Sequence, residues 1–222
     1  MKTMLNRCSA FAGLLAGLFA VPAFAAENPM DHAGIQHNLY LGCLHDIGAD
    51  STNSLALLVD KCGYNPGIPR EEFIKQGQPI VDMDPMQPLA EKMSRYRDRY
   101  SAYEFSFFER IDGVVRTAKD LSQAEAMFAE LEADAIQHLD AKTHSGANVL
   151  AGLSTARHSL RYWTEYASRN DPTGRRKWWH WVVIVVADVA GGVAAAEIGP
   201  AAIGVAGAAS ETANELIQMI DP

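Results

Sequence analysis

The segment that most restricts the fold begins at Arg175, because its composition leaves few places where it can lie. Basic Arg175–Lys177 is followed by three of the chain's four tryptophans, Trp178, Trp179 and Trp181. The β-branched run Val182–Val186 comes next, and a tract rich in Ala and Gly follows it. A stretch this apolar has to be buried, either inside a protein core or against a lipid surface.

Small residues recur along this segment at every fourth position. One row, which predicts close helix packing, contains Ala187, Gly191, Ala195 and Gly199. A second row contains Gly192, Ala196, Pro200, Gly204 and Ala208. On a helix such rows form smooth stripes that let another backbone approach closely, as in glycine zippers and membrane helix pairs. The tryptophans beside a basic triplet are also typical of a membrane headgroup boundary.

Two carboxylates, Asp188 and Glu197, argue against a helix that crosses a membrane. They divide the segment into the uncharged runs Trp178–Ala187, Val189–Ala196 and Ile198–Ser210. Each run is shorter than the roughly 18 residues that a spanning helix needs. A carboxylate near the bilayer centre also costs about 2.5 to 3.5 kcal/mol on insertion scales. Spontaneous spanning is therefore the weaker interpretation.

The favoured interpretation is a hairpin of two buried helices, from Trp178 to Ala196 and from Ala201 to Ile220, broken at Gly199–Pro200. A membrane-active or membrane-associated segment and a homo-oligomer interface are the alternatives. In a buried hairpin the carboxylate of Asp188 needs a partner, because an unpaired buried charge is costly.

Helical periodicity extends over almost the whole chain. One series with steps of three and four is Leu121, Ala124, Phe128, Leu131, Ala135 and Leu139, and a second is Val149, Leu153, Ala156, Leu160, Trp163 and Ala167. Ser122 and Glu125 predict a capping box at the start of the first series. Ser145 and Gly146 predict the break between the two helices. No segment shows the sustained alternation of a half-buried strand, so we predict an all-α helical bundle with a C-terminal Gly/Ala-rich helical hairpin.

The remaining segments predict shorter helices. Asp31–Ile47 and Ser54–Lys61 are two of them, and Pro69 starts another at a position that tolerates proline. Met86–Lys119, with its aromatic residues at helical spacing, predicts one long helix or two in line. The whole divides into a signal peptide (1–25), a helical body (26–174) and a Trp/Gly/Ala-rich helical tail packed on the body (175–222).

The N-terminus resembles a secretory signal peptide in its order of features. Lys2 and Arg7 precede the apolar stretch Phe11–Val21, and Ala23-Phe24-Ala25 supplies the small residues that signal peptidase accepts. Cleavage after Ala25 would remove both basic residues. We therefore expect a periplasmic or secreted protein after signal-peptide cleavage.

Cysteine usage agrees with export. Cys8 would leave with the signal peptide, so the mature chain would carry Cys43 and Cys62. A pair in an oxidising compartment usually forms a disulfide, and a loop of this size would be stabilised by roughly 3 kcal/mol. We predict a Cys43–Cys62 disulfide that ties two neighbouring helical segments.

Charge and composition exclude some classes of function. The chain has 19 Lys and Arg against 27 Asp and Glu, a net charge of -8, which disfavours nucleic acid as a partner. Hydrophobic residues at 48% and charged residues at 21% are close to a soluble globular average. No glycine-rich phosphate loop follows a strand, so no cofactor is predicted.

Catalytic and metal-binding patterns are weak. The pentapeptide Gly152–Ala156 approaches a nucleophile elbow around Ser154, but no strand precedes it, so we expect an ordinary helical serine. Glu130, Asp134 and His138 are four residues apart on one helix face, and His32, His37 and His45 lie in the first helix. Neither Glu-x-x-His nor His-Glu-x-x-His occurs, so we predict no metal site.

A candidate polar network joins the first helix to the helix that contains Trp163. It consists of His37, Asn38, Arg157, His158, Arg161 and Asp188. We expect Arg157, Arg161 or backbone donors to hold the carboxylate of Asp188. A network that keeps the two helices in register is favoured over a polar pocket lined by aromatic residues.

A resemblance is carried by three groups of residues: His37-Asn38, Ala156–Trp163, and the Trp-rich entry into Ala187–Gly191. They resemble a pattern in uncharacterised secreted bacterial helical proteins with a glycine-zipper or bacteriocin-like C-terminal tail. The resemblance covers most of the mature chain and implies no reaction.

The function predicted from the sequence is that of an exported, non-enzymatic helical protein that acts by binding or envelope association through its C-terminal small-residue helices. The partner would be a protein or a membrane, and a homo-oligomer is an alternative. The rival hypothesis is a metal-dependent hydrolase with a His/carboxylate site between helices, using His37, His138 or His158.

Overall fold

The computed structural model describes residues 27–170, 176–197 and 202–220, and within these residues the chain forms helices and no strand. The prediction of an all-α helical bundle is confirmed. The predicted signal peptide, Arg175, Gly199 and the expected break at Gly199–Pro200 lie outside the described residues.

The helices follow one another in a simple order along the chain. They are α1 (Asp31–Asp46), α2 (Ser54–Asp60), α3 (Arg70–Val81), α4 (Leu89–Lys92), the 3-10 helix η1 (Ser94–Arg99), α5 (Ala102–Thr117), α6 (Leu121–His138), α7 (His144–Asn170), α8 (Trp178–Ala196) and α9 (Ala202–Ile220).

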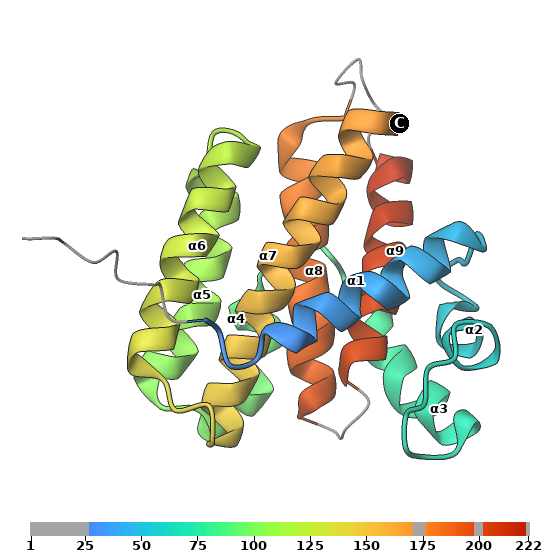
Figure 1. Ribbon diagram of the computed structural model, residues 1–222, viewed down its shortest axis with the longest axis horizontal. Helices are drawn as coiled ribbons and strands as arrows, with labels where there is room; N and C mark the ends of the chain where they lie inside the picture. Colours follow the sequence, from blue (N-terminus) through green and yellow to red (C-terminus); the bar gives the residue numbers. More distant parts are fainter. Residues whose placement is uncertain (1–26, 171–175, 198–201, 221–222) are drawn as a thin grey trace, which may run out of the picture.

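Figure 1 shows how the helices surround α8. α7 and α9 pack directly against α8, and α1 lies across α7 and α9. The pair α5 and α6 covers one side of the bundle, while α2 and α3 lie at the other side, against α9. The most apolar helix of the chain is thus enclosed by the others.

The burial of α8 follows from its composition. A helix that is apolar all round has no polar face to turn toward water, so it is stable only when it is enclosed. Among the described helices, α8 is long and apolar enough to cross a membrane, with a mean hydropathy of 1.6, yet 83% of that stretch is buried inside the bundle. Such burial is typical of the core helix of a globular protein.

The small residues of α8 allow α9 to approach closely. A Cβ atom added to Gly191 would lie 2.8 Å from the Cβ of Ala209 and 3.1 Å from the Cα of Ala206. Ala187 and Ala195, on the same row, are 6% and 0% exposed. Gly191 is therefore the residue of this row at which a larger side chain would push the two helices apart.

Two predicted details of α6 and α7 are wrong. The N-cap of α6 is Asp120, whose carboxylate accepts from the backbone N–H of Gln123, and not Ser122. The break after α6 lies before His144, so Ser145 and Gly146 belong to the first turn of α7. Asp120 caps the helix because it precedes the first helical residue in an extended conformation, which leaves its side chain free to reach back.

The stretch from Met86 to Lys119 is not the continuous helix, or two helices in line, that its spacing suggests. It contains α4, η1 and α5, with an extended residue, Tyr100, before the last of them. The physical reason is local: Ser101 and Glu104 form a capping box that starts α5 afresh. The carboxylate of Asp112 in turn accepts from the backbone N–H groups of Leu89 and Ala90 at the start of α4.

Cys43 and Cys62 lie in disulfide geometry, with their Cα atoms 5.9 Å apart. Cys43 is in the last turns of α1, and Cys62 follows the end of α2. The pair therefore ties α1 to the chain after α2, as the sequence predicts.

Labelling of the denatured protein with a maleimide should modify neither Cys43 nor Cys62 unless a reductant is present. Reduction should lower the free energy of unfolding by about 3 kcal/mol, because the unfolded chain regains the freedom that the closed loop removes. A variant with both cysteines changed to serine is the control, and its stability should equal that of the reduced protein. Two reactive thiols in protein purified without reductant would contradict the disulfide.

Candidate functional site

A cavity of about 240 Å³ lies where α1, α7, α8 and α9 meet. Helix α7 supplies Asn148, Gly152 and Thr155 to its wall, and α8 supplies Gly192 and Ala196. His37 on α1 and Ala206 on α9 also line the cavity. The cavity is predominantly apolar, with a few polar side chains at defined places, which is the usual composition of a small-molecule site.

Small residues on the facing helices create this space. Gly192 and Ala196, which belong to the second row of small residues, are half-buried, as is Ala151 on α7. A Cβ atom at Gly192 would meet the Cβ of Ala206 at an ordinary distance of 3.4 Å, so the α8–α9 packing does not require glycine there. At Gly192 and Ala196 the second row therefore borders a hollow, whereas Gly191 of the first row contacts α9 closely.

Asn148 lines the cavity from α7, and its contacts hold the side-chain amide in one orientation. Its Nδ2 faces three oxygens: the hydroxyl of Tyr100 at 2.7 Å, the carbonyl of Val193 at 3.2 Å and the carboxylate of Glu197 at 3.0 Å. The two carbonyl-type oxygens can only accept, and the Tyr100 hydroxyl donates its own hydrogen to Glu197. The nitrogen of the amide must therefore face this cluster, and the oxygen Oδ1 must face elsewhere.

Glu197 is the centre of that cluster. Its side chain is 0% exposed, it accepts from Tyr100, and Arg99 Nη1 lies 2.7 Å from its Oε2. Burial acts to raise the pKa of Glu197, but the hydrogen bonds from Tyr100 and Arg99 outweigh burial and hold the pKa below its usual value. A paired carboxylate thus lies behind the Asn148 wall.

A second buried cluster contains His37, Asp188 and Ser159. Asp188 is 0% exposed, and its Oδ2 accepts from the Ser159 hydroxyl and lies 3.6 Å from Nε2 of His37. The cluster is next to the cavity along two helices, since Ser159 is one turn beyond Thr155 on α7 and Asp188 is one turn before Gly192 on α8.

The hydrogen bonds around His37 place a hydrogen on its Nδ1. Nδ2 of Asn38 donates to the carbonyl of His158 at 2.8 Å, so Oδ1 of Asn38 faces Nδ1 of His37 at 3.0 Å. An amide oxygen only accepts, which means that Nδ1 carries a hydrogen. The other ring nitrogen, Nε2, faces the Asp188 carboxylate at 3.6 Å, which is beyond hydrogen-bond distance.

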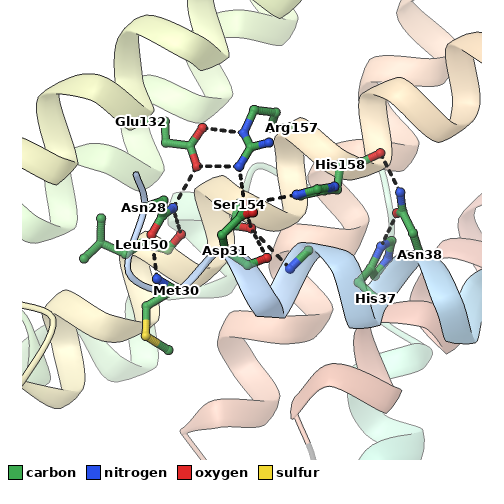
Figure 2. A network of polar contacts seen from close by, with 11 residues as sticks. Asn28, Met30, Asp31, His37, Asn38, Glu132, Leu150, Ser154, Arg157 and His158 are labelled. Atoms are coloured by element: carbon green, nitrogen blue, oxygen red, sulfur yellow. Dashed lines mark hydrogen bonds and ion pairs between the residues drawn. The ribbon is translucent and has the colours of Figure 1, made fainter. Parts of the chain in front are cut away.

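A third network joins the N-terminal segment to α1, α6 and α7, and Figure 2 shows it in detail. Arg157 pairs with both Asp31 and Glu132, while Asn28 donates to Glu132 at 2.7 Å and to the carbonyl of Leu150 at 2.9 Å. Burial acts to raise the pKa of Asp31, but the hydrogen bond from His158 and the charge of Arg157 hold it below its usual value.

The hydroxyl of Ser154 also belongs to this third network, where it accepts from the backbone N–H of Gly34 at 3.2 Å and donates to the carbonyl of Asp31 at 3.0 Å. Ser154 lies inside α7 and is 0% exposed, so it joins helices and is not presented to a substrate.

A larger groove of about 440 Å³ lies beside this network, lined by residues that include Glu27, Asn28 and Ala133. Three of its charged groups, Asp31, Glu132 and Arg157, are already paired with one another. The cavity beside Asn148 is the stronger candidate site, because its wall is mainly apolar with a few polar residues.

The structure brings together most of the polar residues chosen from the sequence, but it pairs them differently. His37, Asn38, Arg157 and His158 lie at the crossing of α1 and α7 (Figure 2). Arg161 is exposed. The expectation that an arginine holds Asp188 is wrong: Arg157 is engaged by Asp31 and Glu132, and Asp188 is held by Ser159 and faces His37.

The residues that the sequence reasoning missed are Asn148, Thr155 and Ser159. All three are buried polar residues on α7. Asn148, Gly152 and Thr155 have the spacing i, i+4, i+7, which places them on one helix face with a glycine between two polar residues. A glycine between two polar residues on a buried helix face could have indicated a cavity with a polar residue at each end.

The rival metal site has no matching geometry in the described residues, where no group of three or more His, Cys, Asp or Glu side chains is placed to hold an ion. Asp134 pairs with Arg110 at 2.6 Å and with His138 at 2.8 Å. Glu130 is exposed, one turn before Asp134 on α6.

Comparison of the chain with protein-family models, with curated proteins and with solved structures finds no match.

Proposed function

We propose that the protein is an exported, non-enzymatic binding protein that holds a small, mainly apolar molecule in the cavity between α1, α7, α8 and α9. The observation that carries the proposal is the cavity itself, about 240 Å³ in volume, predominantly apolar and with Ala or Gly at half of its lining positions. An apolar cavity of roughly 150 Å³ in another protein is large enough for benzene.

The energetics favour an apolar occupant. Water inside such a space finds few hydrogen-bond partners, whereas an apolar ligand gains about 25 cal/mol for each Å² of apolar surface removed from water. The C-terminal helices act here as the wall of a binding site, since α8 is enclosed by the bundle and not available to a membrane in this fold. This supports the binding version of the function over envelope association.

Filling the cavity should abolish binding. Ala151 is half-buried and lines the cavity, so the Ala151→Leu side chain can enter the space without displacing a helix. We expect saturation-transfer NMR to detect ethylbenzene or indole bound to the wild type, with at least a tenfold weaker affinity for the Ala151→Leu variant. A ligand of this size binds weakly, with dissociation constants on the order of 0.1 to 1 mM.

The control for this experiment is Ala126→Leu. Ala126 lies on α6, is exposed and is not part of the cavity wall, so the same change of side chain should leave the affinity unchanged. Absence of binding of both probes and of the related alcohol 2-phenylethanol to the wild type, or equal weakening by the two substitutions, would overturn the proposed function.

A further inference from the structure

Two residues of the cavity wall each have a polar side-chain atom that makes no hydrogen bond to any residue that the structure describes. Asn148 and Thr155 are each 5% exposed and both line the cavity. In the part of the chain that the structure describes, every hydrogen bond of the Asn148 side chain is made by Nδ2, and Oδ1 accepts none. The hydroxyl of Thr155 makes no hydrogen bond among the same described residues. It lacks even the bond to the carbonyl four residues earlier in its own helix that the hydroxyl of Thr117 makes in α5, where it bonds Gly113.

The Asn148 oxygen differs from the Thr155 hydroxyl in what it can do. A hydroxyl rotates and can both donate and accept, whereas an amide oxygen only accepts. The orientation of the Asn148 amide is set by the three oxygens around Nδ2, so Oδ1 is a fixed acceptor that stays in place when a ligand enters. A ligand without a donor would cover Oδ1 and leave it without a hydrogen bond, which is unfavourable.

We infer that the cavity selects neutral molecules in which a short apolar body carries a hydroxyl group, and that this hydroxyl donates to Oδ1 of Asn148. The inference rests on the proposed function, since it names the class of ligand for the same cavity. An alcohol supplies the missing donor at a lower cost than an ion does, because an uncharged hydroxyl loses less hydration and regains a hydrogen bond at Oδ1.

The charges around the cavity disfavour an anionic ligand. Glu197 Oε1 lies 3.0 Å from the same Asn148 amide, and Asp188 lies one helical turn from Gly192 on α8. Two histidines, His32 and His144, are exposed at the cavity edge, and Nε2 of His144 faces Glu197 at 3.4 Å. A carboxylate would meet the Asn148 oxygen without a proton to donate and would be repelled by Glu197 behind it.

A cationic ligand is also disfavoured, although it carries donors. An ammonium group would have to leave water for a mainly apolar cavity, and the Glu197 carboxylate that could attract it is already paired with Arg99 at 2.7 Å. Neutral donors avoid this loss of hydration.

Four probes with the same aromatic body test the inference on the wild-type protein at pH 7: 2-phenylethanol, ethylbenzene, phenylacetate and 2-phenylethylamine. We expect 2-phenylethanol to bind about tenfold more tightly than each of the others by ligand-observed NMR titration, the factor that one satisfied hydrogen bond supplies. Equal affinity of ethylbenzene, or tighter binding of phenylacetate or of the amine, would overturn the inference while leaving the proposed function standing. If neither these four probes nor indole binds, the proposed function fails as well.

Two substitutions locate the hydroxyl contact. Asn148→Ala should reduce the affinity for 2-phenylethanol to that for ethylbenzene, whereas Thr155→Val, which removes the other unpaired polar atom of the wall, should keep the preference for the alcohol. Loss of the preference in Thr155→Val and its retention in Asn148→Ala would overturn the assignment to Asn148. Asn148→Ala also removes a donor to Glu197, so the folding of this variant is checked by circular dichroism. The ligand class is decided by the four probes on the wild-type protein and does not depend on this variant.

Discussion

Replacing Gly34 by alanine should lower the free energy of unfolding by about 2 to 3 kcal/mol, even though alanine is the better helix former. Gly34 lies in α1 where that helix crosses α7. A Cβ atom there would be 2.5 Å from the carbonyl oxygen of Ser154 and 2.5 Å from the ring of His158. The carbonyl belongs to the backbone of α7 and cannot rotate away, so the two helices would have to separate.

Separation would also break the polar contacts at this crossing. The backbone N–H of Gly34 donates to the Ser154 hydroxyl at 3.2 Å, and Asn38 donates to the carbonyl of His158 at 2.8 Å. Both bonds connect α1 to α7, and the second also orients the amide that faces His37. The penalty for Gly34→Ala is therefore expected at the upper end of the range for an overpacked site.

Gly42 provides the matched control, because it lies in the same helix and a Cβ atom there would meet only the ring of Tyr162, at 4.0 Å. Gly42→Ala should raise the free energy of unfolding by roughly 0.5 to 1 kcal/mol, through helix propensity alone. Urea denaturation with the disulfide intact measures both variants. If the two substitutions shift stability in the same direction, the close crossing of α1 and α7 is wrong.

The helices could be predicted from the sequence because their signal is local. Apolar residues three and four positions apart within one segment report the buried face of that segment, and the helices from Trp178 and from Leu121 follow such series closely. The exact residue at which a helix begins was harder to predict, because it depends on a single N-cap side chain. Ser122 with Glu125 has the composition of a capping box, yet Asp120 precedes it and takes the capping role.

The sequence predicts the wrong partner for Asp188, because the charge of an arginine favours it as a partner even though it lies on a different face of α7 from the buried residues. Arg157 and Arg161 are four residues apart and share one face of α7, whereas Ser159 shares a face with Ala156 and Trp163, both of which are 0% exposed. The apolar pattern of α7 already places that second face toward the core, where α8 lies. A hydroxyl on this face was a better candidate partner for a buried carboxylate than a guanidinium beside it.

The cavity could not be predicted from the sequence, because a hollow is a property of several helices together. The first row of small residues on α8 includes Gly191, which contacts α9 closely, while Gly192 in the second row borders open space. Gly191 and Gly192 are the same residue type, so only their direction relative to α7 and α9 decides which one packs closely and which one borders the cavity. That direction is set by tertiary packing.

The largest expected loss of stability is for Asp188→Leu, at about 3 to 5 kcal/mol, the cost of removing one partner of a buried side-chain pair. The Asp188 carboxylate accepts from the Ser159 hydroxyl and faces Nε2 of His37, and both of these side chains are 1% exposed or less. Leucine would leave the buried Ser159 hydroxyl without its acceptor and would remove the carboxylate that the His37 ring faces.

A double-mutant cycle separates this pairing from a general effect of the new side chain. In a His37→Leu background, Asp188→Leu should cost at least 1 kcal/mol less than in the wild type, because the ring that faces the carboxylate is already gone. Equal costs in the two backgrounds would show that His37 and Asp188 do not act as a pair.

The same Asp188→Leu variant also distinguishes a buried tail from a membrane-inserted one. If α8 inserted into a bilayer, removing its carboxylate would strengthen liposome binding, because that charge is the main obstacle to insertion. In the observed fold α8 is enclosed, so we expect lower thermal stability and no gain in liposome flotation. An unchanged melting temperature together with stronger liposome association would mean that α8 works in the membrane, since only a lipid environment makes loss of the charge favourable.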